Sequence, residues 1–420
     1  MAKTIKTNLE FLLVKAEVKG VPCRRQPEGC ASRCAATPRR GSLLYKRAMF
    51  TAAVVAIAMM GLASEPSPGE VRKNPAASGI SGPGGKVIGN GRERWNKDLP
   101  GRGMVRVSNN STMEKGLLPP IKPLAEIHVR DTIITLGGDG NYYLTGSTGD
   151  DIWDFNDGVE LWRSSDMQNW EYVGLVWDVR RDGTWEKEPR DLHGKPTVTV
   201  WAPEIHYLPL CKKYVIVLSM APSGISMLVS DKPEGPYVNH VKENNGRLCS
   251  GIDATIFEDD DGKIYFTNGP ASRISRVKPD FSGFEETRET VLLNPDLNPA
   301  HHAKKIVARG MKGFGHEGAC LFKANGWYYL GAVDDYEGRY SQCVARSRSV
   351  WGPYDHWQET VPCGGGTNFF QDKEGRWWGA FFGNDKSAPW MEKAGAVRVK
   401  FDSDGKILVD EQPDWNLTDD

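Results

Sequence analysis

The chain has 420 residues, of which 39% are apolar and 25% are charged, a balance that is ordinary for a soluble globular protein with a large core. Residues 1–63 hold 11 of the 53 Lys and Arg but only 3 of the 54 Asp and Glu, so without them the net charge falls from −1 to −9. A chain this acidic is not expected to bind nucleic acid.

The first 124 residues are predicted to precede the folded domain. Residues 1–45 are basic and show no periodicity, so we interpret them as a spurious or disordered extension. Residues 46–63 start with a Lys-Arg pair, continue as an apolar run and end in small residues, which is typical of a secretory signal peptide. The run is too short for a transmembrane helix, so we expect an exported protein, periplasmic or extracellular, with no membrane attachment after signal removal. Residues 64–124 are rich in Gly and Pro and indicate a linker or an extended arm.

Five segments beyond residue 125 share one pattern, a turn followed by an aromatic and β-branched run. They begin at Asp139, Cys211, Asp261, Asn325 and Glu374. Asp-Gly and Asn-Gly before such runs indicate β-hairpins, because tight hairpin turns require positive φ. Five such repeats, without a convincing long amphipathic helix, predict an all-β fold, a five-bladed β-propeller over residues 125–415. A β-sandwich would explain the strands but not the fivefold recurrence.

Three carboxylates stand on strand-like segments ahead of three of these turns. Each lies eight residues before its turn: Asp131 before Asp139-Gly140, Asp253 before Asp261-Gly262, and Glu317 before Asn325-Gly326. Innermost strands of a propeller converge on a central channel, so equal spacing predicts three equivalent points that meet in one cluster. Hydrolysis of a glycosidic bond needs one carboxylic acid and one carboxylate base. A third carboxylate nearby helps to keep the acid protonated.

Four motifs around these acids carry a family resemblance. They are Arg130-Asp131 ahead of Asp-Gly-x-Tyr-Tyr-Leu-Thr, Trp201-Ala202-Pro203-Glu204-Ile205, Ile252-Asp253-Ala254 ahead of Asp-Asp-Asp-Gly-Lys, and Glu317-Gly318 ahead of Asn-Gly-Trp-Tyr-Tyr-Leu. Over about residues 125–412 the chain resembles glycoside hydrolase family 43, which comprises five-bladed propeller arabinofuranosidases, xylosidases and arabinanases. The resemblance implies that Asp131 is the general base and Glu317 the general acid. It implies that Asp253 is the modulator that keeps the acid protonated and orients it. Family members invert configuration, which requires a base and an acid roughly 6.5 to 9.5 Å apart.

The resemblance also bears on cofactors. Many family members carry a His in the stretch that corresponds to residues 364–369, where it approaches a metal ion in the channel. Thr367 and Asn368 stand there instead, so we expect no required cofactor and no metal ligand among the predicted site residues. A structural calcium in the channel would need His301, His302 or His316 to take over that role. The simpler interpretation of these His residues is that they are hydrogen-bonded polar groups.

Five residues are candidates for contacting a carbohydrate: Trp153, Phe155, Trp201, His316 and Asn368. Trp153 and Phe155 fall in a loop of the first blade, where a flat ring either covers the C–H face of a sugar or simply packs. Trp201 either lines the pocket floor or wedges between blades. His316 precedes the predicted acid and is a candidate hydrogen-bonding partner of the substrate.

The resemblance implies an inverting glycoside hydrolase of α-L-arabinofuranosidase or β-xylosidase type, acting on arabinose- or xylose-containing plant polysaccharides or oligosaccharides. Two alternatives stay open. One is a non-catalytic sugar-binding propeller, against which the presence of all three acids argues. The other is a related propeller glycosidase that acts on fructosides or agar-derived sugars.

Overall fold

The structure is a computed structural model, and it describes residues 105–106, 118, 121–149, 156–294, 313–384, 388 and 390–410. The predicted extension (1–45), the predicted signal peptide (46–63) and two of the sugar-contact candidates, Trp153 and Phe155, lie outside these residues. Within the described ranges, no helix has the length and apolar character needed to cross a membrane.

The described strands form five antiparallel sheets with four strands each, and one sheet gains a fifth, short strand. Blade 1 contains β2 (Arg130–Leu136), β3 (Tyr142–Ser147), β4 (Gly158–Ser164), β5 (Asn169–Asp178) and, beside β5, β1 (Val105–Arg106). Blade 2 contains β8 (Val200–Leu208), β9 (Lys213–Met220), β10 (Ile225–Ser230) and β11 (Val238–Asn239). Blade 3 contains β12 (Ile252–Glu258), β13 (Ile264–Gly269), β14 (Arg273–Val277) and β15 (Phe284–Glu289). Blade 4 contains β16 (Glu317–Ala324), β17 (Trp327–Tyr336), β18 (Arg339–Ser347) and β19 (Asp355–Val361), and blade 5 contains β20 (Gly364–Gln371), β21 (Trp377–Gly383), β22 (Ala394–Phe401) and β23 (Ile407–Val409).

The remaining elements lie between blades 1 and 2 and at the end of blade 2. A one-turn helix, α2 (Val179–Asp182), follows β5 and is capped by the Asp178 carboxylate. A two-stranded hairpin of β6 (Arg190–Leu192) and β7 (Lys195–Thr197) precedes β8, and a single 3₁₀ turn, η1 (Asn244–Gly246), follows β11.

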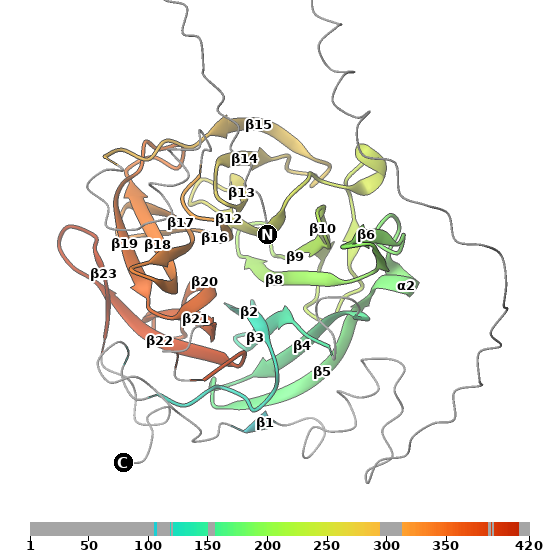
Figure 1. The fold of residues 1–420 in the computed structure, drawn as a ribbon, viewed down its shortest axis with the longest axis horizontal. Coiled ribbons are helices and arrows are strands. Elements are labelled where there is room, and N and C mark those ends of the chain that lie inside the picture. Colours follow the sequence, from blue (N-terminus) through green and yellow to red (C-terminus); the bar gives the residue numbers. More distant parts are fainter. Residues whose placement is uncertain are drawn as a thin grey trace, which may run out of the picture. The chain divides into compact units, whose positions relative to one another are not determined.

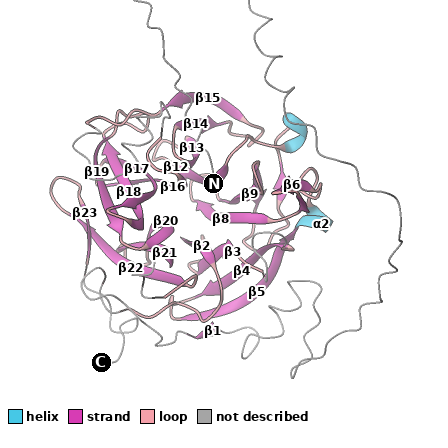
Figure 2. Ribbon diagram, in the orientation of Figure 1, coloured by secondary structure: helices cyan, strands magenta, loops and turns pink. Residues whose placement is uncertain are grey.

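The five sheets are arranged around a central axis with β2, β8, β12, β16 and β20 innermost (Figure 1). Each innermost strand packs against the innermost strands of both neighbouring blades, so the ring is closed. Strands dominate the described chain (Figure 2). The predicted all-β five-bladed β-propeller is therefore confirmed.

Apolar side chains fill the five spaces between adjacent blades, one cluster in each space. Between blades 5 and 1, for example, Ile134 and Trp162 meet Trp378. Because a neighbouring sheet covers each face of a blade, the strands are buried on both faces. Strand β9 is buried at every position after Lys213. This is why the second strands of the blades appear in the sequence as nearly continuous apolar runs rather than as alternating patterns.

The predicted hairpin turns are present. Gly140, Gly262 and Gly375 have φ between 77° and 78° in the turns that connect the first and second strands of blades 1, 3 and 5. In blade 4 the corresponding turn is the two-residue Asn325-Gly326 pair, with φ of 50° and 73°. Both residues need positive φ in such a turn, which Asn and Gly adopt at the lowest steric cost.

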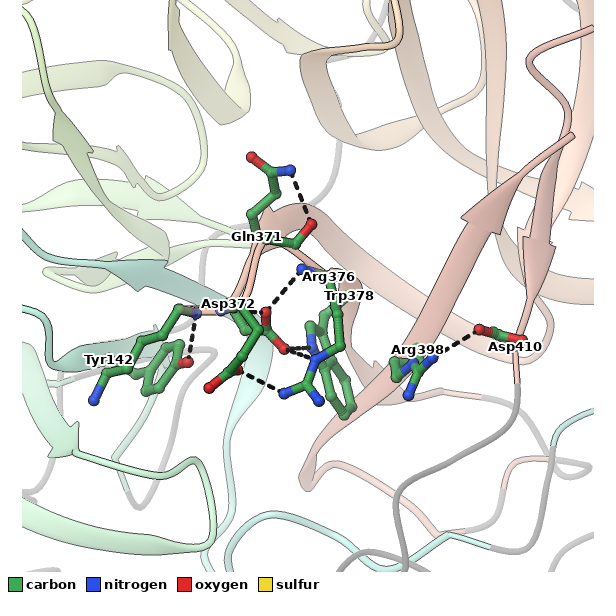
Figure 3. Close-up of polar contacts among 10 residues, drawn as sticks. Tyr142, Gln371, Asp372, Arg376, Trp378, Arg398 and Asp410 are labelled. Carbon is green, nitrogen blue, oxygen red and sulfur yellow. Dashed lines mark hydrogen bonds and ion pairs between the residues drawn. The ribbon is translucent and has the colours of Figure 1, made fainter. Parts of the chain in front are cut away.

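Contacts between blades 5 and 1 complete the ring. The Asn368 side-chain amide donates to the Ile134 carbonyl at 2.7 Å, and its oxygen accepts from the Ile134 N–H at 3.0 Å. In the turn after β20, the backbone N–H of Lys373 donates to the Tyr142 hydroxyl at 3.0 Å. Asp372 fixes this turn, because its carboxylate accepts from the Trp378 indole at 2.8 Å and from Arg376 Nε at 2.7 Å (Figure 3).

Part of the predicted arm packs against the propeller. Leu118 and Ile121 are buried in the cluster between blades 4 and 5, and Leu124 is buried between blades 5 and 1. The Leu124 N–H also donates to the Ala394 carbonyl of β22 at 2.8 Å. Leu118, Ile121 and Leu124 therefore contribute to the core of the domain.

A β-bulge recurs in the innermost strand of every blade. In each blade the innermost strand has one extra residue relative to the second strand, with which it pairs. The extra residue comes directly after the last regular pair, which is formed by Arg130, Trp201, Ile252, Glu317 or Gly365. The residue that follows has positive φ in all five blades: Asp131 (52°), Ala202 (43°), Asp253 (53°), Gly318 (61°) and Gly366 (55°). Bulges re-aim side chains and often occur beside functional sites. Here they form a ring of five equivalent distortions at one end of the channel.

Candidate active site

The bulges bring the three predicted acids together, although not all at equivalent points. Asp131 and Asp253 occupy the same bulge position in blades 1 and 3, as the sequence predicts. In blade 4 that position is Gly318, so Glu317 lies one residue earlier, where blade 1 has Arg130. The expectation of three equivalent points is thus right for two acids and off by one residue for Glu317.

Asp131 is held by a chain of hydrogen bonds that crosses from blade 1 to blade 2. The Ser147 hydroxyl donates to Asp131 Oδ2 at 2.5 Å. The Ser147 oxygen in turn accepts from the backbone N–H of Ala202, the bulge residue of blade 2, at 2.7 Å. Gly366 lies on the other side, where a Cβ atom would come within 2.7 Å of the Asp131 Cα. The Asp131 side chain therefore has a fixed orientation.

Arg130 places a positive charge beside this carboxylate. Its guanidinium pairs with Glu392 Oε1 at 2.7 Å, donates to Asn384 Oδ1 at 3.2 Å and lies 4.6 Å above the Phe382 ring. His128 Nε2 contacts the other oxygen of Glu392. The loop after β21 thus anchors Arg130 from blade 5. The positive charge favours the ionised form of Asp131, which a general base needs.

Asp253 bridges blades 2, 3 and 4. Its backbone N–H donates to the Ser219 hydroxyl at 2.8 Å. Its Oδ2 atom accepts from the backbone N–H of Gly318 at 2.9 Å. Because Gly318 follows Glu317 directly, this bond holds the Asp253 carboxylate against the strand that carries the predicted acid.

Glu317 receives a hydrogen bond from within its own blade. The Tyr340 hydroxyl on β18 donates to Glu317 Oε1 at 2.7 Å. Tyr340 also lies edge-on to His316, with ring centroids 5.8 Å apart. These contacts leave Glu317 partly exposed at the start of β16, where its charge acts on Asp131.

The three carboxyl groups interact electrostatically. Burial raises the pKa of Asp131, and Glu317 and Glu392 raise it further, while Arg130 and Ser147 lower it. Burial together with the charges of Asp131 and Glu317 holds the pKa of Asp253 well above the usual range of an aspartate. Like charges this close resist ionising together, so Asp131 and Asp253 retain a proton to higher pH than a lone carboxyl group does.

Glu204 of the Trp-Ala-Pro-Glu motif is a fourth carboxyl group near the cluster. It is buried, and His206 Nε2 lies 2.8 Å from its Oε2. Burial raises the pKa of Glu204, whereas its contacts with His206 lower it. This pair explains why the motif contains a Glu, which the sequence alone left without a role.

The structure places three of the five sugar-contact candidates. Trp201 is half-buried at the position of blade 2 that corresponds to Glu317 in blade 4, directly before the bulge. His316 adjoins Glu317 and Tyr340, so both Trp201 and His316 lie at the end of the channel that holds the acids. Trp153 and Phe155 fall outside the described residues. The sugar contacts of all four residues stay predictions.

Asn368 differs from these candidates because both ends of its amide are bonded to the Ile134 backbone. It lines a channel cavity of about 150 Å³ together with His206, Thr255 and Cys320, and none of the three acids lines that cavity. Its contacts are those of a brace between blades 5 and 1. A role in substrate binding stays a prediction for which the structure shows no contact.

The described part of the channel does not fit a calcium site. Among the described residues, no group of three or more His, Cys, Asp or Glu side chains is arranged to hold a metal ion. Where family members carry the metal-associated His, the Asn368 oxygen is occupied by the Ile134 N–H. His301 and His302 lie outside the described residues. We therefore assign no step of the chemistry to a metal.

Sequence reasoning missed Ser147, Ser219 and Tyr340. Ser147 and Ser219 are the residues that pair across the sheet with Arg130 and Trp201, directly before the bulges, and a repeat alignment of the second strands would have found them. Tyr340 has no such signal, because it reaches Glu317 from β18 and β17 lies between the two strands in the sheet.

Comparison with known proteins agrees with this geometry. Residues 121–407 match the family described as Glycosyl hydrolases family 43. The chain belongs to glycosyl hydrolase family 43. The resemblance inferred from the four motifs is thus confirmed.

Relatives in glycosyl hydrolase family 43 come from fungi and bacteria. The chain is 27% identical to a Xylosidase/arabinosidase 43B of Humicola insolens, over 53% of this chain and 39% of that protein. It is 28% identical to a Putative beta-xylosidase of Escherichia coli (strain K12), over 51% of this chain and 38% of that protein. The chain therefore spans about two-fifths of the length of these curated relatives.

Solved structures share the propeller fold. A GH43_1 enzyme from Xanthomonas citri complexed with xylose has a TM-score of 0.52 at 20% identity, and the match covers 71% of this chain and 94% of that one. An exo-1,5-α-L-arabinanase from a bovine ruminal metagenomic library has a TM-score of 0.50 at 17% identity, and covers 71% of this chain and 100% of that one.

Proposed function

We propose that this chain is an inverting glycoside hydrolase of α-L-arabinofuranosidase or β-xylosidase type, which acts on arabinose- or xylose-containing plant polysaccharides or oligosaccharides. One observation carries the proposal: the bulges of blades 1 and 3 and the first residue of β16 present three carboxyl groups that interact at one end of the channel. The names of the relatives, which are xylosidases and arabinosidases, support the substrate class.

In the proposed reaction, Asp131 accepts a proton from a water molecule whose oxygen attacks the anomeric carbon. Glu317 donates its proton to the glycosidic oxygen as the bond from that oxygen to the anomeric carbon breaks. The products are a sugar of inverted configuration and an alcohol, and proton exchange with solvent returns Asp131 and Glu317 to their starting states. The hydrogen bonds from Ser147 and Tyr340 hold both carboxyl groups in place before the substrate arrives.

The test is a panel of 4-nitrophenyl glycosides and oligosaccharides with arabinofuranosyl, xylosyl, fructosyl and agar-derived residues. We expect hydrolysis of the arabinofuranosyl or xylosyl compounds and a loss of at least about 1,000-fold in Asp131→Asn. A matched control is Asp260→Asn, which removes a carboxylate from an exposed turn at the far end of β12 and should keep wild-type rates. Binding of sugars without hydrolysis of any compound would support the non-catalytic sugar-binding alternative. Hydrolysis of the fructosyl or agar-derived compounds alone would support the alternative of a related propeller glycosidase that acts on those sugars.

We also propose that the protein is exported. The support is the apolar run in residues 46–63 with its preceding Lys-Arg pair. Expression in a bacterial host followed by N-terminal sequencing should find a mature protein that begins close to Ser64. A secreted protein that retains residues 1–45 would contradict the proposal.

A further inference from the structure

Tyr340 occupies a space that blade 5 leaves open for it. Its side chain is half-buried, although β18 is the third strand of blade 4. Gly365 stands opposite, and a Cβ atom there would lie 2.1 Å from Tyr340 Cε1. Gly365 takes the position that is Arg130 in blade 1 and Glu317 in blade 4, so any other residue at this point would displace the Tyr340 ring. The ring centroids of Tyr340 and Phe382 lie 6.3 Å apart. The Phe382 ring in turn contacts the guanidinium group of Arg130.

This packing aims the phenol at one oxygen of the predicted acid. The Tyr340 hydroxyl donates to Glu317 Oε1 at 2.7 Å, within the range of a strong O–H to carboxylate bond. With Oε1 occupied, Oε2 is the oxygen that can carry the transferable proton. We propose that Tyr340 is a positioning residue that fixes which oxygen of Glu317 delivers the proton to the leaving group, and that it opposes the effect of Asp253 on the protonation of this acid. The inference rests on the proposed function and deepens it.

The charged groups around Tyr340 determine its state. Burial raises the pKa of Tyr340 well above the usual range of a phenol, and the carboxyl groups of Glu317, Asp131 and Asp253 raise it further. Arg130 is the cation that faces it from blade 1, and the His316 ring lies edge-on from the loop before β16. Tyr340 is therefore a hydrogen-bond donor throughout the pH range in which a glycosidase of this kind would work.

The two neighbours of Glu317 act in opposite directions. A donor to a carboxyl group favours its ionised form, whereas a nearby carboxylate favours its protonated form. Removing the Tyr340 hydroxyl should therefore keep the proton on the acid to higher pH. The alkaline limb of the kcat/KM profile should then shift to higher pH by about 0.5 to 1 unit. The rate on substrates with poor leaving groups should fall roughly 10-fold, because the freed carboxyl group no longer holds one orientation.

The experiment compares Tyr340→Phe with Tyr329→Phe. Tyr329 is a buried tyrosine of blade 4, and its hydroxyl donates at 2.7 Å to the Gly405 carbonyl in the turn between β22 and β23. Both variants lose one hydrogen-bonded hydroxyl group, so a purely structural effect would appear in both. We expect the alkaline limb to rise in Tyr340→Phe and to stay in place in Tyr329→Phe, with thermal unfolding confirming that both are folded. An unmoved limb in a folded, active Tyr340→Phe would overturn the inference.

A second variant covers the case in which Tyr340→Phe does not fold. Site-specific 3-fluorotyrosine at position 340 retains the ring and the hydroxyl but is a stronger donor, so the alkaline limb should move down. A limb that moves up or stays would reject the inference. Failure of the proposed function looks different, because the wild-type protein itself would then hydrolyse none of the glycosides in the panel.

Discussion

Removing the charge of Asp253 should move the alkaline limb of the pH profile downward. In Asp253→Asn the amide oxygen can still accept from the Gly318 N–H, so the geometry of the bulge is retained. What disappears is one of the carboxyl groups whose mutual repulsion makes the cluster hold its proton. The acid should then lose its proton at lower pH, and the range of pH in which the enzyme is active should narrow from the alkaline side.

The size of this shift follows from the separation of the groups. Asp253 Oδ2 lies 2.9 Å from the backbone nitrogen of the residue after Glu317, and the charge of Glu317 acts on Asp253. We take a separation of about 6 Å between the two carboxyl groups as the order of magnitude for the Coulomb energy. At that distance, with an effective dielectric constant of about 20, two like charges repel by about 2.8 kcal/mol, equivalent to about 2 pH units. Relaxation and water in the site reduce this value, so we expect a shift of about 1 to 2 units.

The assay is the pH dependence of kcat/KM for a substrate with a poor leaving group. The control is Asp260→Asn, which makes the same chemical change in an exposed turn of blade 3. An alkaline limb that stays in place in Asp253→Asn, even with a lower maximum rate, would leave Asp253 as an orienting residue and refute its electrostatic role.

Four further predictions follow from the same contacts. Glu317→Gln should lose roughly 100- to 10,000-fold on substrates with poor leaving groups and much less on activated aryl glycosides, and an equal loss on both would reject Glu317 as the acid. Asp131→Asn should lose activity on both kinds of substrate, because an activated leaving group does not replace the base, and a rate close to wild type on either kind would remove that assignment. Because the folded-state pKa of Asp253 is raised, the stability that this group contributes is fully present below about pH 4 and is lost as the pH rises towards the folded-state pKa. Asp253→Asn should therefore unfold at a higher temperature than wild type at pH 7 and at the same temperature near pH 3.5, and a lower Tm at pH 7 would contradict this sign. Asn368→Ala should lower the free energy of unfolding by about 2 to 4 kcal/mol, because it leaves the buried N–H and carbonyl of Ile134 unpaired, whereas the control Asn141→Ala in an exposed turn should change it by less than about 1 kcal/mol.

Much of the fold could be predicted from the sequence because the turn chemistry is local. Asp139-Gly140, Asp261-Gly262 and Asn325-Gly326 require positive φ wherever the chain places them, and the runs that follow are apolar on both faces. Recurrence of such local signals gave the number of blades. The acids were found for the same reason, since each stands at a fixed distance from a turn.

The register within the blades could not be predicted in this way. The turn between β2 and β3 has five residues, whereas the turn between β16 and β17 has two. Equal spacing from the turns therefore concealed the one-residue offset of Glu317. Which residue fills a bulge depends on pairing across the sheet, and this is a property of tertiary structure.

The contacts that surround each acid could not be predicted from the sequence either. Tyr340 on β18 reaches Glu317 on β16 across the intervening strand β17. The Tyr340 ring has room there because Gly365 of blade 5 has no side chain. Asn368 appeared as a substitute for a metal-associated His, and its contacts with Ile134 became visible only when blades 5 and 1 met. Contacts between blades carry no local signal.

The stereochemistry of the first product tests the central claim most directly. Proton NMR of the sugar released from an arabinofuranosyl or xylosyl substrate, recorded before the anomers equilibrate, should show the configuration opposite to that of the substrate, because one displacement by water activated at Asp131 inverts the anomeric carbon. A first product with the configuration of the substrate would require a covalent intermediate and would contradict the assignment of Asp131 as a base and Glu317 as an acid.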